Sequence, residues 1–241
     1  MLRIFFYLIV VLCVAYVLAA ESALAETKVI QGELAEGDKV HKDRESFVDY
    51  YEMDVSSGNL MTVTMVSTED DGFDTYLYVT GPSGQELSND DSSEVDGSQL
   101  IFVVTETGPW EISATGYEDA KGAYKLGIRT QKLTRLLSER GELGTDSKKL
   151  MKYGEFYDLH TVPVEAGKTY AAIAVSSDID TFLSVHFPGG LVTNDSAPSD
   201  YNKSLAIFKP SKAGEAKVIM TSSDAEEEGR YRLYVYQAAD E

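Results

Sequence analysis

Two groups of acidic and amide side chains have the composition of a cation site. The first group comprises Asp70, Asp71, Asp74, Asn89, Asp90 and Asp91, and a poorer second group comprises Asp178, Asp180, Asn194 and Asp195. Facing carboxylates repel each other unless a cation lies between them. Calcium takes about six to eight oxygen ligands from carboxylates, amides, backbone carbonyls and water. We therefore expect a calcium site in the first group and a weaker one in the second.

The alternative is that Asp74 and Asp180 cap turns by accepting backbone N–H bonds, while the other acids are solvated. The strand pairing in a hairpin would determine which residues of the first group face each other. Gly81-Pro82-Ser83-Gly84 is a turn sequence, and residues equidistant from an antiparallel turn face each other. If Val79 pairs near Gln85-Glu86, Asp74 falls opposite Asp90-Asp91.

Aromatic side chains supply a second candidate site. The chain has 15 Tyr, and tyrosine combines an apolar face with a hydrogen-bonding edge that suits sugar or peptide ligands. We take Tyr51, Tyr78 and Tyr117 as the best exposed candidates for such a platform. The alternative for the aromatic residues is packing within the sheets. We expect that packing for Trp110, because its alternation with polar Glu111 points it inward.

Catalytic motifs are absent from the sequence. The histidines His41, His160 and His186 are scattered, and none belongs to a His-Glu-x-x-His arrangement or a closely spaced metal-ligand pair. No serine lies in a Gly-x-Ser-x-Gly elbow, and the single cysteine, Cys13, lies in the N-terminal apolar run. We therefore expect a protein that is not an enzyme. The alternative is a glycosidase-like pair among the many carboxylates, although acids at strand ends of a repeated sandwich are more often structural.

Charge excludes some partners. With 21 Lys and Arg against 40 Asp and Glu, the formal charge is −19, whereas affinity for phosphate backbones comes from clustered basic residues. We therefore expect no nucleic-acid partner.

The N-terminus has the pattern of a signal peptide. Arg3 precedes an apolar run, and Ala23-Leu24-Ala25 has the small-x-small pattern of a cleavage site. We expect residues 1–25 to be removed, which predicts a secreted or periplasmic bacterial protein with no stable membrane insertion afterwards. The alternative is an uncleaved membrane anchor, since a spanning helix needs about 20 apolar residues.

An internal repeat indicates two copies of one domain. Gly32-Glu33-Leu34 returns as Gly141-Glu142-Leu143, and Gly122-Ala123-Tyr124-Lys125-Leu126 returns as Gly229-Arg230-Tyr231-Arg232-Leu233. A repeat of this length is far too long for a solenoid, so we expect each copy to fold around its own core. The predicted domains are residues 26–130 and 141–241, joined by a linker at 131–140.

Each copy alternates polar and apolar residues with the period of strands, as in Met61-Thr62-Val63-Thr64-Met65. Turn residues separate these segments, which predicts an all-β fold in which each copy is an antiparallel sandwich or barrel. Only residues 131–140 have a helical spacing, through Leu133, Leu136 and Leu137. A linker that packs on one domain is the preferred interpretation of that segment.

Both copies resemble the bacterial pre-peptidase C-terminal domain. In the first copy the resemblance lies in Tyr50 to Val55 leading to Gly58, in Asp74-Thr75-Tyr76-Leu77, in the turn before Asn89-Asp90-Asp91, and in the closing Gly122 to Leu126. The second copy is more divergent, with His160 and Pro163 in its first strand. The resemblance implies that each copy is a non-catalytic accessory module, so that the chain forms two tandem antiparallel β-sandwiches, jelly-roll-like in topology. Some members in bacterial collagenases bind calcium.

Three functions follow as alternatives. The first, which we prefer, is an exported binding module in tandem, whose ligand is a protein or polysaccharide outside the cytoplasm; two weak contacts then add through effective concentration. The second is a structural envelope protein stiffened by calcium. The third is an accessory or inhibitor of a secreted peptidase acting in trans.

Overall fold

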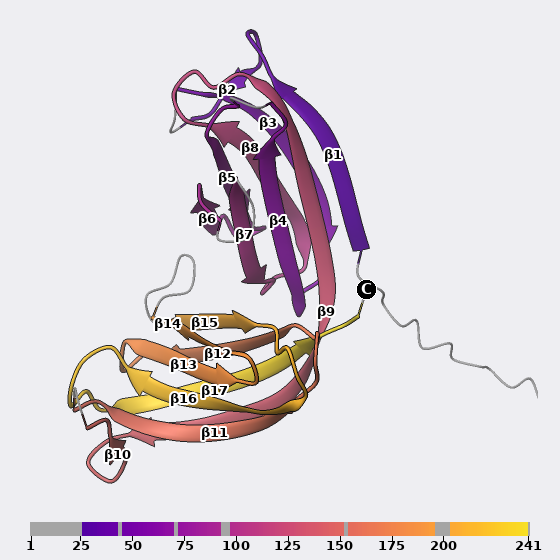
Figure 1. The fold of residues 1–241 in the computed structure, drawn as a ribbon. Helices are drawn as coiled ribbons and strands as arrows, with labels where there is room; N and C mark the ends of the chain where they lie inside the picture. Colours follow the sequence, from indigo (N-terminus) through magenta and orange to yellow (C-terminus); the bar gives the residue numbers. More distant parts are fainter. Residues whose placement is uncertain are drawn as a thin grey trace, which may run out of the picture.

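The structure is a computed structural model that describes residues 26–42, 45–69, 72–92, 97–151, 154–195 and 203–240. These residues form strands and no helix (Figure 1). The strands of the first half are β1 (Glu26–Leu34), β2 (Lys39–Val40), β3 (Phe47–Val55), β4 (Asn59–Ser67), β5 (Thr75–Thr80), β6 (Glu86–Asn89), β7 (Ser98–Val103) and β8 (Gly108–Gly116). The predicted signal peptide lies outside the described residues.

A long strand, β9 (Gly122–Leu143), leads from the first half into the second. The strands that follow are β10 (Lys148–Lys149), β11 (Phe156–Val164), β12 (Tyr170–Ser176), β13 (Thr181–Phe187), β14 (Gly190–Asn194), β15 (Lys203–Phe208), β16 (Gly214–Ser222) and β17 (Gly229–Ala238). Every pairing between them is antiparallel.

The two halves have the same topology. In the first half a five-stranded sheet runs β2-β3-β8-β5-β6, and in the second the corresponding sheet runs β10-β11-β16-β13-β14. The opposing sheets are β1-β9-β4-β7 and β9-β17-β12-β15. Because each strand of the first half has a counterpart at the same place in the second, the prediction of two tandem antiparallel β-sandwiches is confirmed.

Strand β9 belongs to both halves. Its first part pairs with β1 and β4, up to Asn59 opposite Lys132, and its second part pairs with β17 from Leu133 opposite Ala238. The Leu133 N–H donates to the Gly58 carbonyl over 3.0 Å, and the Ala239 N–H donates to the Lys132 carbonyl over 2.8 Å. The chain therefore passes from one sandwich to the other between two adjacent residues (Figure 1).

The helical alternative for residues 131–140 is wrong, because this segment lies within β9. The role of the segment as the linker between two domains stays a prediction. The register shifts between Val235 opposite Leu137 and Tyr236 opposite Arg135, so Leu136 is an extra residue on β9. Such a bulge moves the following side chains to the other face of the strand. A bulged strand can therefore place leucines at spacings that also suit a helix.

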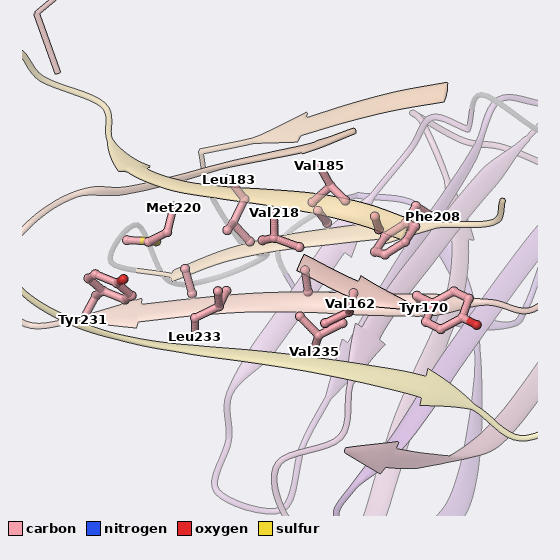
Figure 2. Close-up of a cluster of buried hydrophobic side chains, with 14 of the residues drawn as sticks. Val162, Tyr170, Leu183, Val185, Phe208, Val218, Met220, Tyr231, Leu233 and Val235 are labelled. Atoms are coloured by element: carbon pink, nitrogen blue, oxygen red, sulfur yellow. The ribbon is translucent and has the colours of Figure 1, made fainter. Parts of the chain in front are cut away.

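Each half encloses its own apolar core between its two sheets. Figure 2 shows the second core, in which Leu183, Val218 and Leu233 from three strands pack together. In the first core Trp110 is only 1% exposed, as its alternation predicted, and its ring lies 5.3 Å from that of Phe102. Burial of such large side chains contributes about 1.5–3 kcal/mol each.

The repeated Gly-Glu-Leu segments have a packing reason. Gly32 lies opposite Tyr124 in the β1–β9 pair, and Gly141 lies opposite Tyr231 in the β9–β17 pair. A Cβ atom at Gly32 would lie 2.3 Å from the Tyr124 ring, and one at Gly141 would lie 2.4 Å from the Tyr231 ring. Each tyrosine ring therefore lies across the backbone of a glycine in the neighbouring strand.

Among the described residues, no helix is long and apolar enough to cross a membrane.

Candidate binding site

The β5–β6 hairpin that carries the first acidic group has a different register from the predicted one. Val79 lies opposite Leu87, not Gln85 or Glu86, and Leu77 lies opposite Asn89. Both strands end before the acids meet, because β5 begins at Thr75 and β6 ends at Asn89. The turn is longer than predicted, so the position opposite Asp74 would fall after Asp91 and not at Asp90 or Asp91.

The two repeated asparagines hold the strand that follows their loop. The Asn89 side-chain amide donates to the Asp91 carbonyl over 2.6 Å and to the Gln99 carbonyl over 2.8 Å. In the second half the Asn194 side-chain carbonyl accepts the Leu205 N–H over 2.9 Å. Both asparagine side chains therefore form hydrogen bonds with backbone groups, and their role as metal ligands stays a prediction.

Within the first group, Asp90 accepts a side-chain hydrogen bond, and two other aspartates are exposed. The Tyr117 hydroxyl donates to the Asp90 carboxylate, while Asp74 and Asp91 are exposed. Asp70 and Asp71 lie outside the described residues. Within the part of the chain that the structure describes, no three His, Cys, Asp or Glu side chains form a metal-sized group.

The second group is engaged in other contacts. Hydrogen bonds from Ser177, and then from Arg230, hold the pKa of Asp178 below its usual value. The Asp180 N–H donates to the Glu227 carboxylate over 3.3 Å, while one buried oxygen of Asp180 has no hydrogen-bond partner in the described residues. Burial raises the pKa of Glu227. Asp195 is exposed.

Aromatic side chains gather on the outer face of the sheet β2-β3-β8-β5-β6. Tyr76 and Tyr78 occupy alternate positions of β5, and their side chains lie on the sheet face opposite to that of the core residue Leu77. Their ring centroids lie 4.8 Å apart. The His41 ring stacks on Tyr78 at 4.3 Å, and the Tyr117 ring meets Tyr76 edge-on at 5.5 Å. We call His41, Tyr78, Tyr76 and Tyr117 the aromatic row.

The strands beside the aromatic row carry small side chains. Tyr78 lies opposite Ser113 on β8, and Ser113 lies opposite Tyr50 on the far side. Tyr117 is 38% exposed and Tyr50 is 37% exposed, whereas Tyr78 is only 8% exposed because its ring is covered by neighbouring rings. His41 is only 4% exposed, so Tyr117 and the half-buried Tyr76 are the rings of the row that a ligand can reach. Such rings offer an apolar surface with a hydroxyl edge, which suits a sugar or peptide ligand.

Tyr51, the third predicted ligand residue, faces the core. It packs against the first core cluster, and its hydroxyl lies 2.6 Å from that of Tyr124, which donates to Asp49 over 2.6 Å. The sequence holds the signal for this orientation, because Met53 and Val55 follow Tyr51 at alternate positions. Its neighbour Tyr50 points outward instead.

Sequence reasoning also missed His41 as a member of the aromatic row. The residue follows the short strand β2, and its N–H donates to the Ser46 carbonyl over 2.8 Å. Only this local turn brings the imidazole over Tyr78, so its spacing in the sequence carried no signal.

Residues 47–116 match the family model described as the bacterial pre-peptidase C-terminal domain. The match runs from the first residue of β3 to the last residue of β8, so it includes Tyr76 and Tyr78 of the aromatic row but not His41 or Tyr117. The resemblance is thereby confirmed for the first copy, and for the second copy it stays a prediction. The match is compatible with a non-catalytic binding module. No curated protein matches the chain.

Two solved structures show weak similarity. One is the N-terminal CBM22-1-CBM22-2 tandem domain of Xyn10C from Paenibacillus barcinonensis, with 10% identity, a TM-score of 0.27, and coverage of 90% of this chain and 94% of that chain. The other is the quasi-atomic model of the PBCV-1 virus capsid, with 8% identity, a TM-score of 0.22, and coverage of 89% and 94%. The fold assignment rests on the strand pairing of this chain itself.

Proposed function

We propose that the chain is an exported, non-catalytic binding protein whose first half holds a protein or polysaccharide ligand on the aromatic row. The observation that carries this proposal is the contact of Tyr117, Tyr76, Tyr78 and His41 on one outer sheet face. Rings that already pack against one another lose little side-chain freedom on binding, which favours affinity. The signal-like residues 1–25 support export.

The experiment measures binding of the full-length protein to insoluble cellulose, chitin and gelatin, which represent neutral polysaccharide and protein ligands. We expect retention by at least one of them, and we expect Tyr117→Ala and Tyr76→Ala to reduce it by about tenfold or more, since truncation of an aromatic hot-spot residue costs about 2 kcal/mol or more. Tyr157→Ala is the matched control, because Tyr157 lies on the corresponding sheet of the second half.

Equal losses in Tyr117→Ala and Tyr157→Ala would assign the binding to another surface. No retention of the wild-type protein by any of the three materials would remove the support for these ligand classes.

A further inference from the structure

Two hollows lie along the outer face of β17. The first, of about 460 Å³, is lined by Arg140, Arg230 and Arg232, and the second, of about 350 Å³, is lined by Lys203, Tyr234 and Tyr236. The two hollows meet at Val175, which lines both of them. We call these six basic and aromatic residues, together with the hollows they line, the basic groove.

The second hollow lies between the two halves of the molecule. Its floor is the outer face of β12, β15 and β17, through Ile173, Leu205 and Tyr234, and first-half residues such as Leu87 and Val103 close its other side. Figure 1 shows that the start of β4 lies on the side of the first half that faces this sheet. The basic lining of the first hollow is therefore followed along β17 by the apolar floor of the second hollow.

The charge of the basic groove opposes that of the whole chain. Its charged lining consists of Arg140, Arg230, Arg232 and Lys203 with a single acid, Asp178, although the chain carries a formal charge of −19. Asp178 is already bonded to Arg230. The groove therefore keeps a local excess of positive charge.

Arg140 and Arg232 form the centre of this excess. They lie directly opposite each other in the β9–β17 ladder, where like charges destabilise a sheet. Both are exposed, and within the described residues neither forms an ion pair. An anion between the two guanidinium groups would relieve their repulsion and accept paired N–H bonds from planar donors.

The tyrosines extend the groove in a straight line. Arg232, Tyr234 and Tyr236 occupy alternate positions of β17, which places neighbouring side chains about 7 Å apart on one face. The Tyr234 and Tyr236 rings are tilted by 30° with centroids 6.2 Å apart. Such rings pack against the apolar faces of sugars while their hydroxyl groups remain available for hydrogen bonds.

We propose that the basic groove binds an anionic polysaccharide, whose carboxylate groups lie on Arg140 and Arg232 and whose sugar rings lie on Tyr234 and Tyr236. An extended peptide suits the floor less well, because peptides add to open sheet edges through backbone hydrogen bonds. The floor strands β12 and β17 are both paired on either side. They offer rings and guanidinium groups instead.

The experiment uses affinity electrophoresis of the full-length protein in gels that contain polygalacturonate, with dextran as the neutral polymer and polyglutamate as the acidic polypeptide. We expect retardation by polygalacturonate alone. The double variant Arg140→Gln with Arg232→Gln, and separately Tyr234→Ala, should weaken it by about tenfold or more. The arginine variant should unfold at the same temperature or higher, because it removes the repulsion between like charges.

The matched control is Lys212→Gln with Lys217→Gln, which removes two exposed cations that lie outside the groove. Its retardation should stay within about twofold of the wild type. Equal weakening in both double variants would overturn the proposal in favour of non-specific charge attraction. Binding of polyglutamate as strong as that of polygalacturonate would assign the groove to acidic polypeptides, and no retardation would overturn it outright.

This proposal concerns a different surface from the aromatic row, so the two can fail separately. Loss of polygalacturonate binding would leave the effect of Tyr117→Ala on neutral polysaccharides or gelatin unchanged, and the reverse also holds.

Discussion

The buried side chains of Tyr124 and Tyr231 make equivalent, partly buried hydrogen bonds in the two halves. Tyr124 donates to Asp49 over 2.6 Å and meets the Tyr51 hydroxyl, whereas Tyr231 donates to Asp158 over 2.7 Å and lies 3.0 Å from the His160 ring. Burial, followed by the hydrogen bond to the neighbouring aspartate, raises the pKa of each tyrosine well above its usual value. These hydroxyl groups therefore hold their protons in the folded state.

Alkaline pH should therefore destabilise the protein. The usual pKa of tyrosine is 10.0. At a pH below this value, both tyrosines are protonated whether the chain is folded or unfolded. Above it the unfolded chain binds fewer protons, so the free energy of unfolding falls by about 1.4 kcal/mol per pH unit for each tyrosine. Urea unfolding followed by circular dichroism from about pH 8 to about pH 11 measures this slope.

The variant Tyr124→Phe with Tyr231→Phe should lose stability at neutral pH and have a shallower alkaline slope. An unchanged slope in this variant would show that other groups cause the alkaline effect.

Calcium binding by the first acidic group has a direct test. If the prediction is right, millimolar calcium raises the unfolding temperature, magnesium does not reproduce the rise, and Asp74→Ala abolishes it, because a ligand that binds only the native state stabilises it. Glu165→Ala, at an exposed turn of the second half, is the control. No rise in the wild type would leave Asn89 and Asp90 with their hydrogen bonds as their only role.

At the scale of strands, paired glycine and tyrosine residues set the close approach of β1 and β17 to β9. We expect Gly141→Ala to destabilise the protein by about 1–3 kcal/mol, because the new methyl group overlaps the Tyr231 ring and forces it to move. Gly144→Ala is the matched control, since its nearest contact would be an ordinary 3.7 Å from Glu228. Denaturant unfolding measures both.

Adding Tyr231→Leu to Gly141→Ala should cost less than the sum of the two single changes, because the smaller side chain leaves room for the methyl group. Strict additivity of the two changes would mean that the glycine is needed for another reason.

The repeat and the alternation predicted the fold class, and the inward direction of Trp110, because both depend only on local sequence. The shared strand β9 was not predictable in this way, since a bulge at Leu136 gives a leucine spacing that also suits a helix. The orientation of Tyr51 was readable from Met53 and Val55. The basic groove was not, because Arg140 and Arg232 meet only through the pairing of distant strands.

At the scale of the whole molecule, two separate cores are joined by one strand. The first core includes side chains up to Ile128, and the second begins with Leu137 and Leu143. The predicted domain boundaries stay a prediction, and the strand partners of β9 change at the step between Lys132 and Leu133. The spacing between the aromatic row and the basic groove then depends on the twist of a strand instead of a flexible linker.

A truncation tests that boundary. The fragment 26–132 retains every residue of β9 that pairs with β1 and β4, so we expect it to unfold cooperatively with Trp110 buried. The fragment 26–121 lacks Tyr124, Leu126 and Ile128 of the core and should be unfolded. Fluorescence of Trp110, the single tryptophan, reports both outcomes. An unfolded 26–132 fragment would show that the first half requires the second.

The continuous strand β9 between the halves also determines where proteases can cleave the protein. Proteases act on extended segments without backbone partners, which in tandem proteins are found between the modules. Here the peptide bond after Lys132, a trypsin target by residue type, lies between a carbonyl that accepts the Ala239 N–H and an N–H that donates to Gly58. Digestion should therefore begin in the loops within a half, and the two halves should not be released as separate fragments.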